Sequence, residues 1–199
     1  PDATRTDVAS IALQTQQLTQ PYVVTLQGRG DSLAVQTDIY RQDAQPKVDV
    51  LLTVDDSGSM SDKQAALGQN FSSFIQFAIS QQVDYHIAVT TTSTRISTSS
   101  NCGPAGSCGT FNNAGGVNII TNSTPNIASV FASNVNVGTN GDATEMGFQA
   151  AYEALTAPNI TGPNNGFLRE EANLAIISVS DAADQSPNSF SFYQNRSEE

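Results

Sequence analysis

The stretch LLTVDDSGSM, residues 51–60, passes from an apolar run directly into carboxylate and hydroxyl side chains. Its spacing, Asp55-x-Ser57-x-Ser59, lets a tight turn eased by Gly58 aim one carboxylate and two hydroxyls at a single point. Oxygen ligands of this hardness suit Mg²⁺, Ca²⁺ or Mn²⁺ rather than a thiophilic metal. Taken alone, the motif also has simpler explanations, because a serine here can cap a helix and an Asp after a strand often forms a turn.

Two further segments carry matching oxygen ligands. Thr144 precedes a predicted helix with a small-residue face, and Asp181 follows the apolar strand LAIISVS. In an open α/β sheet, ligands collect beyond the carboxyl ends of the strands, where successive loops separate. We therefore expect Asp55, Thr144 and Asp181 to converge at one rim of the sheet, which is the arrangement that a bound cation needs.

Other residues compete for the second and third positions of this site. Thr139 lies in the same loop as the predicted threonine ligand, and Asp142 with Glu145 can instead form a helix-capping pair. In the third loop, Asp184 is an alternative to Asp181. Asp181 fits better, because it stands directly at the end of the strand.

Hydrophobic patterns predict the elements that position these side chains. The run VDVLLTV is nearly continuous in apolar residues, as in a central strand covered on both faces. Residues 61–80 have apolar side chains at helical spacing and predict an amphipathic helix on that sheet. The other predicted elements are strands at YHIAVTTTS, GVNIIT and ANLAIISVS and helices over residues 125–133 and 144–155. This alternation indicates an α/β fold with a doubly wound, mainly parallel sheet flanked by helices.

The N-terminal region has a different pattern and predicts a small β-rich accessory segment. Residues 1–20 are polar and form either a linker or an edge segment, whereas YVVTLQ and LAVQTDIY flank GRGDS and predict a hairpin. An isolated hairpin is not stable, so residues 1–45 should pack on the main domain, residues 46–199, or belong to a β-sandwich. Arg29-Gly30-Asp31 can be an integrin ligand, but turn chemistry accounts for these residues.

Composition narrows the function classes. Only 14% of residues are charged and the net charge is −11, which argues against nucleic-acid binding.

Cys102 and Cys108 lie in a Gly/Pro/Ser loop and predict a disulfide in an oxidising compartment, the alternative being two unpaired thiols. No apolar run is long enough to span a bilayer. The chain begins without an initiator Met or a signal-peptide pattern, so we expect a processed or excised piece.

The motif and its surroundings resemble a known family. DDSGSM after VDVLLTV, the later Thr before a helix and the strand-ending Asp resemble the von Willebrand factor A domain with its metal-ion-dependent adhesion site. VDYHIAVTTT and GFLREEANLAIISVSDAADQSP are similar to exported bacterial members. The resemblance implies that Asp55, Ser57, Ser59, Thr144 and Asp181 hold a divalent cation, Mg²⁺ first and Mn²⁺ or Ca²⁺ as alternatives. It also implies that the C-terminal strand and helices of a complete domain are lacking.

What the resemblance implies for function is binding rather than catalysis. The expected partner is a protein whose acidic side chain completes the coordination of the metal, on a secreted or cell-surface protein, with the periplasm as another location. The only histidine, His86, lies in an alternating strand and is expected to be structural, so no enzyme is predicted. Alternatives are a structural subunit of a surface fibre or assembly, with a metal that only stabilises it, and a helper protein of a metal-insertion machine.

Overall fold

The computed structural model describes residues 6–13, 22–29, 46–80, 82–97, 102 and 108–196. The chain divides into two compact units, Pro1–Gln42 and Asp43–Glu199. This division lies within a few residues of the boundary expected from the sequence. Each unit is considered by itself below.

The first unit contains a two-stranded antiparallel sheet. β1 (Thr6–Leu13) pairs with β2 (Tyr22–Arg29) along its whole length. β2 agrees with the first strand of the predicted hairpin. Among the described residues it pairs with β1, so the preceding segment contains a strand, which agrees with the predicted edge segment and not with a linker. The predicted partner strand LAVQTDIY lies outside the described residues, as do Gly30 and Asp31 of the Arg-Gly-Asp sequence.

The second unit is built on a mixed four-stranded sheet with the strand order β5-β4-β3-β6. The strands are β3 (Lys47–Val54), β4 (Asp84–Thr91), β5 (Ile120–Thr121) and β6 (Asn173–Val179). β3 runs parallel to both β4 and β6, and only the short β5 is antiparallel to its neighbour. The carboxyl ends of β3, β4 and β6 therefore lie at one edge of the sheet.

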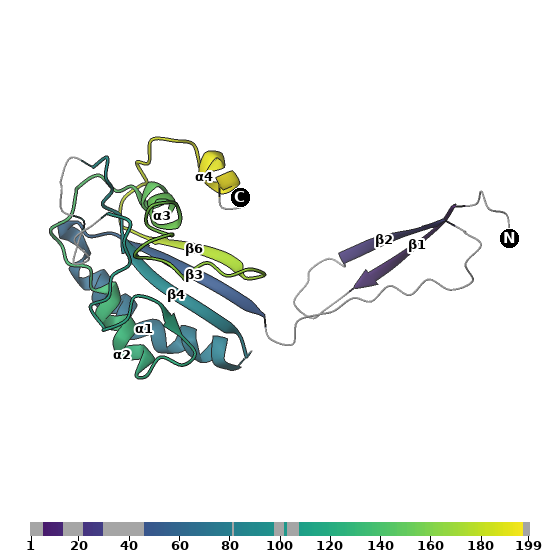
Figure 1. Ribbon diagram of the computed structural model, residues 1–199, viewed down its shortest axis with the longest axis horizontal. Coiled ribbons are helices and arrows are strands. Elements are labelled where there is room, and N and C mark those ends of the chain that lie inside the picture. Colours follow the sequence, from purple (N-terminus) through teal and green to yellow (C-terminus); the bar gives the residue numbers. More distant parts are fainter. Residues whose placement is uncertain are drawn as a thin grey trace. The chain divides into compact units, whose positions relative to one another are not determined.

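Helices flank this sheet on both faces (Figure 1), which confirms the predicted α/β character. The 3-10 helix η1 (Gly58–Met60) leads into α1 (Ser61–Ser80), which packs against α2 (Ile127–Val135) through the stacked rings of Phe71 and Phe131. On the other face, Ala151 and Ala154 of α3 (Gly147–Leu155) join a core cluster with Leu51 and Ala88. Small residues on α3 thus allow the close approach to the sheet that the sequence predicts.

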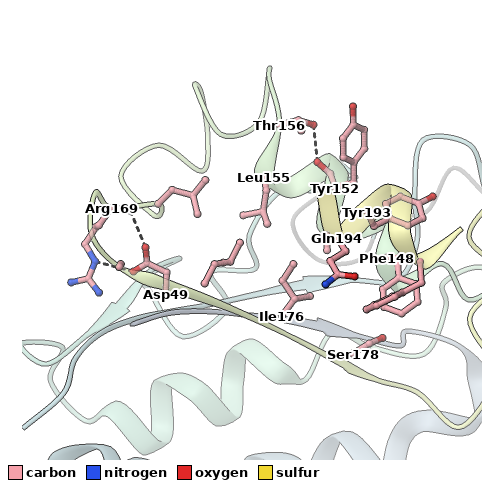
Figure 2. A pocket seen from close by; sticks show the side chains of 15 residues that line it. Asp49, Phe148, Tyr152, Leu155, Thr156, Arg169, Ile176, Ser178, Tyr193 and Gln194 are labelled. Carbon is pink, nitrogen blue, oxygen red and sulfur yellow. Dashed lines mark hydrogen bonds and ion pairs between the residues drawn. The ribbon is translucent and has the colours of Figure 1, made fainter. Parts of the chain in front are cut away.

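A short helix that the sequence did not predict, α4 (Phe190–Arg196), packs beside α3. Phe148 of α3 contacts the rings of Phe190 and Tyr193 at centroid distances of 5.4 and 6.0 Å. Together with Ile176 of β6, these side chains line a groove of about 490 Å³ (Figure 2). The groove extends to the other end of the sheet, where Arg169 contacts Asp49.

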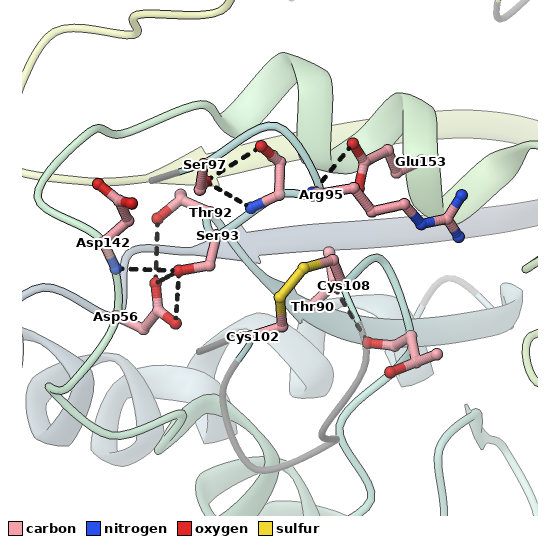
Figure 3. Close-up of a disulfide and its surroundings, with 12 residues drawn as sticks. Asp56, Thr90, Thr92, Ser93, Arg95, Ser97, Cys102, Cys108, Asp142 and Glu153 are labelled. Atoms are coloured by element: carbon pink, nitrogen blue, oxygen red, sulfur yellow. Dashed lines mark hydrogen bonds between the residues drawn. A yellow bond between two sulfur atoms is a disulfide. The ribbon is translucent and has the colours of Figure 1, made fainter. Parts of the chain in front are cut away.

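Cys102 and Cys108 form the predicted disulfide, which lies near the loop that follows β4 (Figure 3). In the described part of the chain, no helix has the length and apolar character needed to cross a membrane. The disulfide is consistent with an oxidising, extracellular environment.

Candidate functional site

The loop after β3 holds the three side chains of the Asp-x-Ser-x-Ser motif. Asp55 is fully buried, and its Oδ1 accepts a 2.8 Å hydrogen bond from the Ser57 backbone N–H. The Ser57 and Ser59 hydroxyl oxygens lie 3.5 Å apart in the exposed part of the loop. The motif therefore places one buried carboxylate and two accessible hydroxyls in a single turn.

The loop after β6 lies beside this motif. Ser59 Oγ donates a 3.1 Å hydrogen bond to Asp181 Oδ1, although 122 positions separate the two residues. Ser180 Oγ donates a 2.6 Å hydrogen bond to Asp55 Oδ2. The Lys63 ammonium lies 2.9 Å from Asp181 Oδ2, and hydrogen bonds from Lys63 and Ser59 hold the pKa of Asp181 below its usual range. The structure thus brings the first and third predicted ligand loops together.

Asp184, the alternative to Asp181, has different contacts. Its Oδ2 accepts a 3.2 Å hydrogen bond from the Phe148 backbone N–H, and its Oδ1 accepts one of 3.0 Å from the Ser186 N–H. Phe148 belongs to the first turn of α3, whose backbone N–H groups have no partner within the helix. Asp184 therefore stabilises the start of α3. Of the two aspartates, Asp181 is the one that accepts the hydrogen bond from Ser59.

Thr144 lies in the segment before α3 and is half-buried. Its backbone N–H donates a 2.8 Å hydrogen bond to Asp142 Oδ1, and among the described residues no hydrogen bond joins its hydroxyl to the loop after β3. The alternative capping pair does not form, because the N-cap position of α3 is Met146, without a side-chain hydrogen bond. The Glu145 carboxylate instead accepts a 2.6 Å hydrogen bond from Thr92 Oγ1.

A second polar network, which the sequence analysis missed, surrounds Asp56 (Figure 3). Asp56 is 1% exposed, and Ser93 Oγ lies 2.9 and 3.1 Å from its two carboxylate oxygens. Thr92 Oγ1 lies 3.4 Å from Asp56 Oδ1, and the Asp142 N–H donates a 3.1 Å hydrogen bond to Ser93 Oγ. The sequence does contain a signal for this network, namely the Thr and Ser residues at the end of YHIAVTTTS. They follow β4, whose carboxyl end lies at the same edge of the sheet as that of β3, so hydroxyl groups could be expected beside Asp56.

Burial changes the acidity of the two carboxyl groups in this region. Burial raises the pKa of Asp56 from the usual 3.8 to about 6, despite the opposing hydrogen bond from Ser93. Burial also raises the pKa of Glu145, from 4.5 to about 7, and the nearby Asp55 carboxylate adds to this effect. Both groups are therefore more easily protonated in the folded protein than in the unfolded chain.

Without divalent cations, the protein should lose stability as the pH rises from about 4 to about 7. A carboxyl group whose pKa is raised by folding stabilises the protein fully below its ordinary pKa. That contribution is lost as the pH passes about 6 for Asp56 and about 7 for Glu145. The lowered pKa of Asp181 acts in the opposite direction, but below its usual value of 3.8.

The check is the free energy of urea unfolding in EDTA, measured across this pH interval. Asp56→Asn should make the decline shallower between about pH 4 and about pH 6, because it removes one of the two titrating groups. A stability that rises with pH across the interval would contradict the assignment.

His86 lies away from this rim, in β4. Its Nδ1 lies 3.0 Å from the Phe167 carbonyl oxygen and 3.9 Å from Asp49 Oδ1. A ring nitrogen facing a carbonyl carries the proton and donates it. His86 therefore joins β4 to the segment before β6, as expected for a structural histidine.

The oxygen atoms at the rim are of the type that hard divalent cations prefer. The carboxylates of Asp55 and Asp181 and the hydroxyls of Ser57 and Ser59 come from two loops, and Ser59 lies within hydrogen-bond distance of Asp181. Among the described residues, no group of three or more His, Cys, Asp or Glu side chains is arranged as a metal centre. Comparisons with protein-family models, curated proteins and solved structures found no match to this chain.

Proposed function

We propose that residues 46–199 form a von Willebrand factor A-type, doubly wound domain that binds a protein partner through a divalent cation. The proposed ligands are Asp55, Ser57, Ser59, Thr144 and Asp181, with Mg²⁺, Mn²⁺ or Ca²⁺ as the ion. The observation that carries the proposal is the hydrogen bond from Ser59 to Asp181, which joins two distant loops beside Asp55. Helices on both faces of a mainly parallel sheet also support it.

The chemistry of these ligands favours binding over catalysis. Two carboxylates and neutral hydroxyls leave a divalent ion with open positions, which an acidic side chain of a partner can fill. Catalysis would need a further acid, base or nucleophile, and His86 is engaged with the Phe167 carbonyl. The disulfide between Cys102 and Cys108 supports a secreted or cell-surface location, where such adhesion takes place.

Adding a divalent cation to EDTA-treated protein should raise the free energy of unfolding. A cation at 100 times its dissociation constant contributes roughly 2.7 kcal/mol by mass action. Asp55→Asn should abolish this increase, because the amide keeps the shape of the side chain but lacks the charge. Asp62→Asn is the matched control, since Asp62 is exposed on α1, and it should retain the full increase.

The measurement is thermal unfolding of the parent and both variants in EDTA and then in excess Mg²⁺, Mn²⁺ or Ca²⁺. No increase in the parent, with metal analysis finding no bound ion, would rule out the cation site. The structural-subunit alternative would then be the better hypothesis.

A further inference from the structure

Lys63 brings a positive charge onto one of the proposed cation ligands. Its Nζ lies 2.9 Å from Asp181 Oδ2 and donates a 3.0 Å hydrogen bond to the Ser59 carbonyl oxygen. Ser59 Oγ donates a 3.1 Å hydrogen bond to Oδ1, the other carboxylate oxygen of Asp181. Both carboxylate oxygens of Asp181 are therefore engaged, and one of them is engaged by an ammonium group.

The place of Lys63 in its helix does not explain this contact. Lys63 is the third residue of α1, which begins at Ser61. The first turn of a helix carries partial positive charge from its free N–H groups, so a carboxylate such as that of Asp62 is favourable there and an ammonium group is not. Lys63 is also one of only two lysines in the chain. Its contacts with Asp181 and Ser59 thus compensate for an unfavourable position.

The Lys63 ammonium and a divalent cation cannot share the Asp181 carboxylate without a cost. Positive charges within about 4 Å of each other repel even in water. The Lys63 and Asp181 side chains are 49% and 29% exposed, so the lysine can move into solvent when a divalent cation binds. Because an exposed ion pair contributes little free energy, Lys63 can weaken the binding of a divalent cation but cannot prevent it.

We propose that Lys63 competes with the divalent cation for Asp181 and thereby lowers the affinity of the site. This inference rests on the proposed function, in which Asp55 and Asp181 are the two carboxylate ligands. Lys63 neutralises one of these two negative charges. Removing the ammonium group should therefore tighten cation binding, whereas the loss of a residue with a purely structural role should weaken it.

The test is isothermal titration calorimetry of the whole chain with MgCl₂, MnCl₂ and CaCl₂. Lys63→Met should tighten the binding of these ions by about 5-fold, the change that corresponds to the upper end of what an exposed ion pair contributes. Lys63→Arg keeps the positive charge and should bind the ions as the parent does.

Lys47→Met is the matched control for net charge. It removes the same charge as Lys63→Met, but from a pair with Glu171, so the affinity for each ion should stay that of the parent. A gain of the same size in both variants would show a general effect of net charge and would overturn the competition.

The other outcomes separate this inference from the function on which it rests. Unchanged or weaker binding in Lys63→Met, with binding in the parent, overturns the competition and leaves the cation site standing. Binding in Lys63→Met but not in the parent supports the competition. If neither protein binds any of the three ions, both proposals fail. Should Lys63→Met fail to fold, Lys63→Gln replaces it, because glutamine also removes the charge and is a good helix former.

Discussion

Replacing Arg169 with Met should lower the free energy of unfolding by about 3–5 kcal/mol. The Arg169 Nε and backbone N–H each donate a 2.8 Å hydrogen bond to the carboxylate of Asp49. Its Nη1 donates a 2.7 Å hydrogen bond to Asp84 Oδ1. Asp49 is 1% exposed, so the substitution leaves a buried carboxylate without its cation (Figure 2).

Urea unfolding at neutral pH measures this loss. Lys47→Met is the matched control, because Lys47 Nζ lies 3.9 Å from Glu171 Oε2 in a pair whose side chains are 38% and 76% exposed. Such a pair contributes less than about 1 kcal/mol. An equally small loss in Arg169→Met would mean that Asp49 finds another partner, and His86 Nδ1, which lies 3.9 Å from Asp49 Oδ1, is the candidate.

Replacing Gly141 with Ala should lower the free energy of unfolding by about 3 kcal/mol, the upper end of the usual cost of overpacking. A Cβ at this position would overlap the buried carboxyl group of Asp56. The Gly141 N–H also donates a 2.7 Å hydrogen bond to the Asp56 carbonyl oxygen, so the two segments cannot separate freely. Because Asp56 adjoins Asp55, the same substitution should also weaken cation binding.

Thermal unfolding in EDTA measures the stability of this variant without the cation. Gly58→Ala is the control for stability, since nothing lies within 4 Å of the position that its Cβ would take. If Gly141→Ala unfolds at the temperature of the parent, the Asp56 carboxyl group moves aside without cost, and its contacts with Ser93 do not determine the shape of the rim.

The sequence determined most elements of the second unit, because strands and helices are encoded by the pattern of consecutive residues. The predicted helix over residues 61–80 has the same bounds as α1, and VDVLLTV lies within β3. The pairing of β1 with β2 was not predictable in this way, because the polar segment containing β1 has only weak periodicity. The seven-residue α4 was also missed, because so short a segment shows little helical pattern.

The sequence likewise identified the part of the candidate site that is local. Asp55-x-Ser57-x-Ser59 is one turn, and Asp181 could be assigned because parallel strands end at a common edge. The tertiary structure alone placed Glu145 beside Thr92, 53 positions away, and Arg169 beside Asp49, 120 positions away. These contacts depend on how the loops pack against one another around the sheet. Such long-range packing cannot be predicted from the spacing of residues along the chain.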